Sequence, residues 1–500
     1  MSEAEQSYRQ AVADHEAGRL EAAVDKYRRV LRAEPRHRLA LPNLGAALCD
    51  LGHNEEGLLI LEQVAGEARD WSASALYNLG VAQLAVSRFE EAVTNLELAD
   101  SLEPGKATVQ IKLAVALTGM GEFDRAQTLF SRVIEAQPDY GWAQDGMATL
   151  LEQRHHWREA LDHRRAAVRA LPGNTEAEIK LALSLLRFGH YEEAWPHFDL
   201  RLKSEVLKDV VGDRRIPVPD WDGGDLDGSE ILVHGEQGLG DNIQFVRFAA
   251  GVAARGGLVT LACPRPLARL LATVPGVGGV LAPESIEPDA RLEFEPDRFA
   301  CQIAIMSLPR ALNVTSGENS SRVPYVSVDP AAAAQWRAVL EGAAADTKVR
   351  IGVVWAGSPT HINDCHRSIP LGDLEPLFGL PGVAYFSLQV GEARRALGAA
   401  DGTWPIHDFA DRFADFHDTA ALIQELDLVV TVDTAVAHVA GALGRPVWVL
   451  VPTVPDWRWL IDRDDSPWYP TMRLFRQRLD EDWSGVVGRV REALVDHFQS

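Results

Sequence analysis

The sequence predicts an all-α repeat array followed by an α/β region built from two halves, each with its own parallel sheet. Alanine and aromatic residues recur every 34 positions through roughly the first two hundred residues. From residue 230 onward, short β-branched runs alternate with helical patterns, as in parallel sheets with crossover helices. Two turns that lead from a strand into a helix lie nearly two hundred residues apart, and they indicate two facing nucleotide-type domains.

Length and composition limit the possible functions. A chain of 500 residues is too long for one hydrophobic core and indicates about three domains. Lys and Arg number 49 against 72 Asp and Glu, a net charge of −23, which disfavours nucleic-acid and anionic-membrane partners. The four cysteines show no CxxC spacing, so a disulfide framework and a structural zinc site are both disfavoured. The polar start and the lack of a long apolar run predict a soluble, cytoplasmic protein without a membrane span.

The helical array is predicted from alanines that follow an aromatic residue by three positions. They are Ala92, Ala126, Ala160 and Ala194, each 34 residues from the next. Small residues let paired helices approach closely, and prolines at the same period end each second helix. This pattern resembles tetratricopeptide repeats, with about six copies in residues 1–208. Such repeats stack into a superhelix that binds proteins, so a protein partner is expected, although a scaffold that only packs or dimerises is the alternative.

The α/β region follows a predicted linker at residues 209–229, which are rich in Asp, Gly and Pro. Residues 230–325 are expected to form the first half and residues 346–482 the second, with a cleft at the carboxyl ends of their strands. Residues 483–500 are predicted to form a closing helix that crosses back to brace the first half.

Six segments of this region carry a resemblance to a known family: HGEQGLGDNIQFVRF at 234–248, WAGSPTHINDCHRSIPL at 355–371, FSLQ at 386–389, VDTAVAHVAGALGRPVW at 432–448, DWRWL at 456–460 and SPWYP at 466–470. Together they resemble glycosyltransferases of the GT-B fold, closest to the family 9, ADP-heptosyltransferase-like group. The fusion to repeats further resembles bacterial protein glycosyltransferases, including those that modify flagellin. The resemblance implies two Rossmann-like domains, with the acceptor on the first and a nucleotide-sugar donor on the second. The nucleotide-sugar is a substrate, so no cofactor is expected.

The first strand-to-helix turn supplies candidate acceptor-side residues. Gly238 and Gly240 permit a tight turn and a close approach of substrate to the backbone, and Asp241 lies where the loop enters its helix. The resemblance implies that Asp241 is the base that deprotonates the acceptor hydroxyl. The alternative is that Asp241 only caps its helix or positions the acceptor. Glu236 is then the next candidate base, with Gln237 beside it.

The second half begins with a candidate donor-binding loop. Trp355 and Gly357 follow a buried strand, and His361, Asn363 and Arg367 come shortly after them. So many hydrogen-bond donors in an acidic protein suit a diphosphate. Arg367 is the expected phosphate clamp, because a fixed guanidinium stabilises the leaving diphosphate without a metal. Enzymes of family 9 often have a lysine near this position, and whether Arg367 replaces it is left open.

The second strand-to-helix turn carries the strongest donor-site pattern. Thr434 and Ala435 begin a helix whose first N–H groups suit a phosphate, and Asp433 is placed to accept from a sugar hydroxyl. His438 lies on the same helix face as Thr434. The alternative is an ordinary helix cap followed by a hydrogen-bonded core histidine.

Two further residues, Ser387 and Gln389, end the intervening strand and are candidates for contact with nucleotide or sugar. The acidic string 462–465 lies outside both turns, so no metal is predicted. The sequence therefore predicts a metal-independent glycosyltransferase that modifies a Ser or Thr hydroxyl of a protein held by the repeats. The alternatives are a transferase that acts on a glycan or a lipid-linked saccharide, and a non-catalytic adaptor with a degenerate nucleotide-sugar module.

Overall fold

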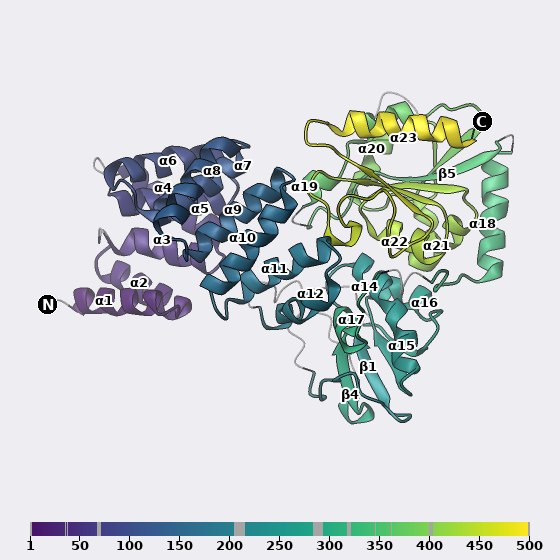
Figure 1. Ribbon diagram of the computed structural model, residues 1–500, viewed down its shortest axis with the longest axis horizontal. Helices are drawn as coiled ribbons and strands as arrows, with labels where there is room; N and C mark the ends of the chain where they lie inside the picture. Colours follow the sequence, from purple (N-terminus) through teal and green to yellow (C-terminus); the bar gives the residue numbers. More distant parts are fainter. Residues whose placement is uncertain are drawn as a thin grey trace. The chain divides into compact units, whose positions relative to one another are not determined.

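The computed structural model describes residues 3–35, 37, 39–67, 72–204, 216–283, 294–317, 322–345, 347–361, 363–399 and 404–498. The chain divides into two compact units, Met1–Gly173 and Asn174–Ser500. Figure 1 shows helices in the first unit and two sheets flanked by helices in the second. The predicted order of an all-helical array and an α/β region with parallel sheets is confirmed.

The first unit is an array of paired helices. Its described helices are α1 (Glu3–Glu16), α2 (Leu20–Ala33), α3 (Ala40–Asp50), α4 (Asn54–Glu67), α5 (Ala73–Ala85), α6 (Phe89–Leu102), α7 (Ala107–Gly119), α8 (Phe123–Ala136), α9 (Gly141–Gln153) and α10 (Trp157–Ala170). Each odd-numbered helix packs against the helix that follows it. Ala92, Ala126 and Ala160 are fully buried where the helices meet, which explains why the period demands a small residue there.

The second unit begins with a segment that we call the brace: α11 (Thr175–Arg187), α12 (Tyr191–Phe198) and η1 (Asp199–Lys203). It continues the repeat period, and Ala194 is fully buried like its counterparts. The predicted repeat domain, 1–208, therefore extends past the division between the two units, because this last helical pair packs with the α/β region that follows it.

The first half of the α/β region contains β1 (Glu230–His234), α14 (Leu239–Phe245), α15 (Ala249–Ala253), β2 (Leu258–Ala262), α16 (Ala268–Leu271), β3 (Val277–Leu281), β4 (Cys301–Ala304) and α17 (Leu308–Ala311). The strands pair in parallel in the order β3-β2-β1-β4. The strand order therefore reverses between β1 and β4, and the loop after β1 leaves the sheet beside this switch point.

The second half contains α18 (Pro330–Ala343), β5 (Val349–Val354), α19 (Asp364–Arg367), η7 (Leu371–Leu377), β6 (Val383–Ser387), α20 (Ala396–Ala399), β7 (Ile406–Asp408), α21 (Phe416–Gln424), β8 (Leu428–Val432), α22 (Ala435–Ala442), β9 (Val447–Val451), η10 (Trp457–Trp459), β10 (Met472–Arg476) and α23 (Trp483–Phe498). Its parallel sheet has the order β10-β9-β8-β5-β6-β7. The chain starts at β5 and moves outward on each side in turn, so the switch point lies between β5 and β8.

Two expected elements behave differently from their prediction. Within the expected linker, residues 209–215 lie outside the described residues, whereas residues 216–229 pack against the first sheet. Trp221 is buried there, and its backbone N–H donates to the Gln302 carbonyl at 2.8 Å. The closing helix does not brace the first half. Val486, Val487 and Leu494 of α23 are buried in the core of the second sheet, together with Leu371, Leu374 and Leu377 of η7.

The brace contacts both halves of the α/β region. The indole N–H of Trp195 donates to the Val314 carbonyl at 2.9 Å, and the Arg187 guanidinium donates to the Pro455 carbonyl at 3.2 Å. Tyr191 packs edge-on against Trp468, with ring centroids 5.4 Å apart. The brace thus belongs structurally to the α/β region that follows it.

Candidate active site

The two predicted turns meet in the structure. Helix α14 of the first half packs against α22 of the second. A Cβ added to Gly240 would lie 2.8 Å from Cδ2 of His438 and 3.6 Å from the Cα of Ala435, so only glycine lets the first turns of the helices come this close. The candidate site is built around this meeting of the turn that follows β1 with the turn that follows β8.

Asp241 makes both kinds of contact that the sequence left open. Its Oδ2 accepts from the Gly238 N–H at 2.8 Å, which caps α14, and its Oδ1 pairs with the Arg458 guanidinium of the second half. Burial raises the pKa of Asp241 above its ordinary value, and the positive charge of Arg458 opposes that rise. A carboxylate with a raised pKa is a stronger proton acceptor and is suited to take a proton from a substrate hydroxyl.

Arg458 links the two halves at this point. It lies on η10, is almost fully buried, and donates through Nη1 to Asp456 Oδ1 at 2.8 Å while Nη2 bonds to Asp241. Its guanidinium also lies 4.4 Å from the ring centroid of Trp457. The sequence interpretation missed Arg458 and Asp456 as site residues. The arginine between two tryptophans in DWRWL could have indicated them, because this arrangement favours a guanidinium packed on an aromatic ring.

The turn after β8 places Asp433 and Thr434 beside this ion-pair cluster. Thr434 is the N-cap of α22 in an extended conformation, and its hydroxyl lies 3.0 Å from that of Thr431 instead of capping the helix. Burial, with a smaller contribution from the charge of Asp456, raises the pKa of Asp433 to about 6, while Arg367 and Arg458 oppose the rise. Because the Thr434 hydroxyl does not cap α22, the first backbone N–H groups of this helix are not bonded to the side chain of their own cap residue.

His438 lies in the core between the helices. Its Nδ1 is 2.9 Å from the Tyr469 hydroxyl, and its ring stacks on Trp459 with centroids 5.3 Å apart. Burial, together with the charges of Arg458 and Arg247, lowers the pKa of His438 to about 3. It is therefore a neutral packing residue that faces Gly240, which matches the alternative of a hydrogen-bonded core histidine.

The loop after β5 brings Arg367 toward the same cluster. Arg367 lies at the end of α19, mostly buried, with its Nε 3.3 Å from Asp364 Oδ1. Gly357 makes room for it, because a Cβ there would lie 2.6 Å from Nη2 of Arg367. Burial and then the charge of Arg367 lower the pKa of His361, whose Nδ1 accepts from the Asn363 N–H at 3.1 Å.

Glu236 does not face the cluster. Its carboxylate is fully buried, accepts from the Arg201 Nε at 2.9 Å and from the Met306 N–H at 3.2 Å, and so holds the loop after β1 against the brace. Because the Glu236 carboxylate is directed at Arg201 and Met306 and not at the cluster, this placement contradicts Glu236 as the next candidate base. Gln237, half-buried, adopts a φ of 55° where the loop turns.

Three predicted donor-side residues hold the scaffold instead of facing the turn. The Trp355 ring is buried in the core of the second half. The Gln389 side chain accepts from the Trp355 and Ala356 N–H groups at 3.1 and 3.0 Å and donates to the Ala356 and Val390 carbonyls at 3.1 and 3.0 Å. Ser387 is fully buried and accepts from the Gln389 N–H at 3.3 Å. These contacts exhaust the Gln389 amide and contradict a direct donor contact by it.

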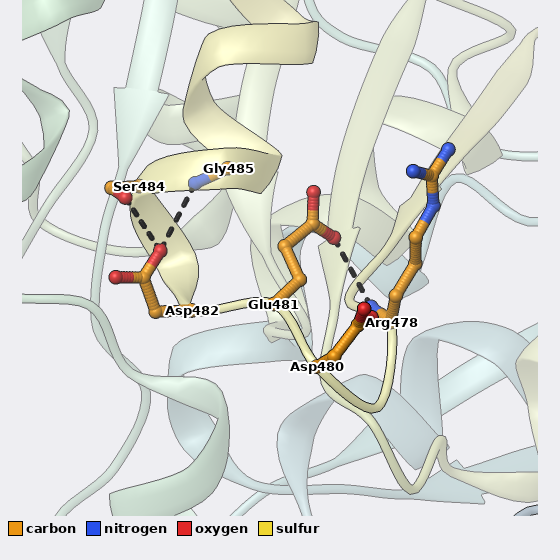
Figure 2. A pocket seen from close by; sticks show the side chains of 6 residues that line it. All are labelled: Arg478, Asp480, Glu481, Asp482, Ser484 and Gly485. Atoms are coloured by element: carbon orange, nitrogen blue, oxygen red, sulfur yellow. Dashed lines mark hydrogen bonds between the residues drawn. The ribbon is translucent and has the colours of Figure 1, made fainter.

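A separate depression lies where α23 begins, and Figure 2 shows its lining residues: Arg478, Asp480, Glu481, Asp482, Ser484 and Gly485. The Asp482 carboxylate accepts from the Gly485 N–H at 3.2 Å, and Glu481 accepts from the Arg478 N–H at 3.1 Å (Figure 2). These acidic groups cap the helix and its preceding turn. None of the predicted site residues lines this depression.

Comparison with family models gives three matches. Tetratricopeptide repeat models match residues 4–104 and 83–148. The model for glycosyltransferase family 9 (heptosyltransferase) matches residues 414–451. That stretch runs from α21 through β8 and α22 to β9, and it contains the turn at Asp433 and Thr434.

Among curated proteins, the chain is similar to Protein FlbA of Caulobacter vibrioides, with 29% identity over 451 residues that cover 87% of this chain and 74% of the relative. Among solved structures, it is similar to TTC0263, a thermophilic TPR protein of Thermus thermophilus, with 21% identity and a TM-score of 0.33 over 37% of this chain and 99% of that one. A tetratricopeptide repeat protein of Parabacteroides merdae shows 16% identity and a TM-score of 0.30, covering 40% and 77%.

The described helices include none that is long and apolar enough to cross a bilayer. The repeat matches lie in the helical array, and the transferase match lies at the turn where Asp433 joins the ion-pair cluster. The chain thus joins tetratricopeptide repeats to an α/β unit with two parallel sheets that is similar, over residues 414–451, to glycosyltransferase family 9.

Proposed function

We propose that the protein is a GT-B glycosyltransferase that moves a sugar from a nucleotide-sugar to a Ser or Thr hydroxyl of a protein bound by its repeats, with flagellin as the candidate acceptor. One observation carries this proposal. The Gly238–Asp241 turn, Arg458 and the Asp433–Thr434 turn come from the two halves and converge beside the switch points of both sheets. Ligands of open α/β sheets bind at such points.

The donor side is supported by the charges around α22. The start of this helix carries a partial positive charge, and Arg367 and Arg458 lie close enough to act on the pKa of Asp433 there. Two guanidinium groups and a helix start together suit the diphosphate of a nucleotide-sugar. The same groups stabilise the departing diphosphate, so the proposal needs no metal ion.

In the proposed reaction, Asp241 acts as the general base. The acceptor hydroxyl gives its proton to the Asp241 carboxylate, and its oxygen bonds to the anomeric carbon of the sugar. The bond from that carbon to the phosphate oxygen breaks, and its electron pair leaves with the nucleoside diphosphate. Burial raises the pKa of Asp241, and this makes its carboxylate a stronger acceptor for the proton of the acceptor hydroxyl.

The acceptor is proposed to be a protein because the chain has an array of repeats of the protein-binding kind. The first experiment identifies it. Proteins from cells with and without the gene are compared by intact mass, and we expect one protein, flagellin first among the candidates, to lose a glycan mass. A lost saccharide on a lipid or a glycan instead would favour the other acceptor class.

Asp241→Asn then tests the chemistry. Asparagine keeps the size of the side chain and its capping oxygen, but it accepts no proton. We expect turnover with the identified acceptor to fall by about 10²–10⁴-fold while donor binding is retained. Asp465→Asn is the matched control, because this exposed carboxylate pairs with Arg463 and is not part of the proposed site. An Asp241→Asn enzyme as active as the control would remove Asp241 from the chemistry, and a wild-type protein that neither transfers nor hydrolyses any nucleotide-sugar would favour the adaptor.

A further inference from the structure

Arg458 is held in an arrangement that leaves part of its bonding capacity unused. Its two terminal nitrogens bond to Asp241 and Asp456. Its Nε, in contrast, is buried without a hydrogen-bond partner among the described residues. A buried guanidinium N–H that lacks an acceptor is costly in a folded protein, so this nitrogen can take an acceptor from a bound ligand.

The same arrangement keeps Asp241 occupied. Its Oδ2 takes the Gly238 N–H, and its Oδ1 takes the Arg458 guanidinium. A carboxylate oxygen bonded to a guanidinium is a weaker proton acceptor than a free one, because the cation stabilises the charged form. Asp241 is therefore placed for the proposed reaction but restrained from it while Arg458 stays in this position.

The charge balance at the site decides what displaces Arg458. The groups that face it are Asp241 from α14, Asp456 beside η10, Asp433 before α22 and Arg367 from α19, together with His361 and the neutral His438. Arg187 also acts on Asp456, and Arg247 acts on His438. A diphosphate at the start of α22 adds further negative charge, which attracts the Arg458 guanidinium. A phosphate oxygen competes with a carboxylate for a guanidinium on equal terms.

We infer that Arg458 is a switch that bonds to Asp241 when the donor site is empty and to the diphosphate when the donor is bound. This inference rests on the proposed function and deepens it. The exchange releases Oδ1 of Asp241 only in the presence of the donor. The donor therefore binds before the acceptor is activated, and water entering an empty site meets no free base. Arg458 acts here as a positioning residue for Asp241 and as a ligand of the donor.

Proton uptake separates this switch from a static ion pair. When Arg458 leaves, Asp241 loses its cation and gains an anionic neighbour, so both changes raise its affinity for a proton. The probe is inorganic pyrophosphate, which is the part that all nucleoside-diphosphate sugars share. Its binding to the full chain is measured by calorimetry at mildly acidic pH in buffers of different ionisation enthalpy, which gives the protons taken up per binding event.

We expect the wild-type protein to take up more protons on binding pyrophosphate than Asp241→Asn does. Asp433→Asn, a carboxylate at the same site without a bond to Arg458, should keep the part of the uptake that belongs to Asp241. Arg458→Gln should weaken pyrophosphate binding by about 10–100-fold, as for a lost charged hydrogen bond. Arg337→Gln, an exposed arginine that pairs with Glu425, is the control for a general charge effect and should bind like the wild type.

The outcomes distinguish the switch from the proposed function. Equal proton uptake by wild type and Asp241→Asn, with pyrophosphate still bound, would overturn the switch and leave the donor site in place. Arg458→Gln with unchanged affinity would do the same. No binding of pyrophosphate or of any nucleoside diphosphate to the wild type would overturn the donor site itself. Should Asp241→Asn melt at a much lower temperature, Asp241→Ser keeps a capping oxygen and gives the same comparison.

Discussion

At the scale of single residues, Gly240 determines how closely the two turns approach. The His438 ring occupies the space that a side chain at position 240 would need. His438 cannot yield easily, because it is stacked on Trp459 and bonded to Tyr469. The distance between Asp241 and the start of α22 thus depends on the absence of one methyl group.

We therefore predict that Gly240→Ala destabilises the second unit by about 1–3 kcal/mol, the usual cost of overpacking, and lowers turnover. Thermal unfolding and the initial rate are measured on one preparation. Gly342→Ala in α18 is the matched control, because a Cβ there meets nothing within 4 Å and a helical alanine stabilises by up to about 1 kcal/mol. A Gly240→Ala protein as stable and active as this control would show that the turns need not approach so closely.

The sequence could predict the residues of the site that belong to local patterns. Asp241 and Thr434 each follow a strand and open a helix, so their placement needs only a few neighbouring residues. Arg458 could not be predicted in the same way, because its partner Asp241 is 217 positions away and the pairing exists only when both halves have folded. Glu236 was misjudged for the same reason: its partner Arg201 comes from the brace.

At the scale of elements, the brace is the feature that separates the observed fold from the expected one. Its period matches that of the repeats, so its small and aromatic positions looked like those of another ordinary copy. The difference lies in what its aromatic residues contact. The second half supplies the partners of these rings: Trp468 packs against Tyr191, and Trp457 packs against Trp195 and Phe198. A local sequence pattern cannot predict these long-range contacts.

The brace makes a prediction about truncation. A chain that begins at Asn174 should fold and keep the affinity of the full chain for nucleoside diphosphates, whereas it should lose transfer to a folded protein acceptor. A chain that begins after Lys203 removes Arg201 and leaves Glu236 buried without its cation, which costs about 3–5 kcal/mol. Circular dichroism, melting temperature and calorimetry compare the two chains. Equal stability of both would show that the brace is dispensable, and full transfer by the Asn174 chain would exclude the repeats before it as the acceptor platform.

At the scale of the whole molecule, the pH dependence of stability follows from two opposed groups at the site. The pKa of His438 falls from 6.5 to about 3 on folding, so the unfolded chain binds the extra proton between these values and stability rises with pH across this window. The pKa of Asp433 rises from 3.8 to about 6, so the folded chain holds that proton and stability falls with pH between them. The two contributions offset each other between about pH 3.8 and 6, and the raised pKa of Asp241 adds to that of Asp433, so the contribution of His438 shows as a difference between the wild type and His438→Asn.

We expect the free energy of unfolding of the wild type, relative to that of His438→Asn, to rise by a few kcal/mol in order of magnitude as the pH increases from about 3 to 6.5. The His438→Asn protein itself should lose stability between about pH 3.8 and 6, because the opposing carboxylates remain. His53→Asn, at an exposed position in the first unit, should keep the pH dependence of the wild type. A slope that is the same in all three proteins would assign the pH dependence to other groups.

The contacts of the brace also bear on how the protein is made. Trp195 bonds to Val314, 119 residues further along the chain, and Tyr191 packs against Trp468, which is synthesised later still. During synthesis on the ribosome, the aromatic face of the brace therefore stays exposed until nearly the whole chain has emerged. Chains interrupted before Trp468 present that face to other nascent chains and to chaperones. The completeness of the α/β halves therefore decides whether the last repeat is a folded element or an aggregation-prone one.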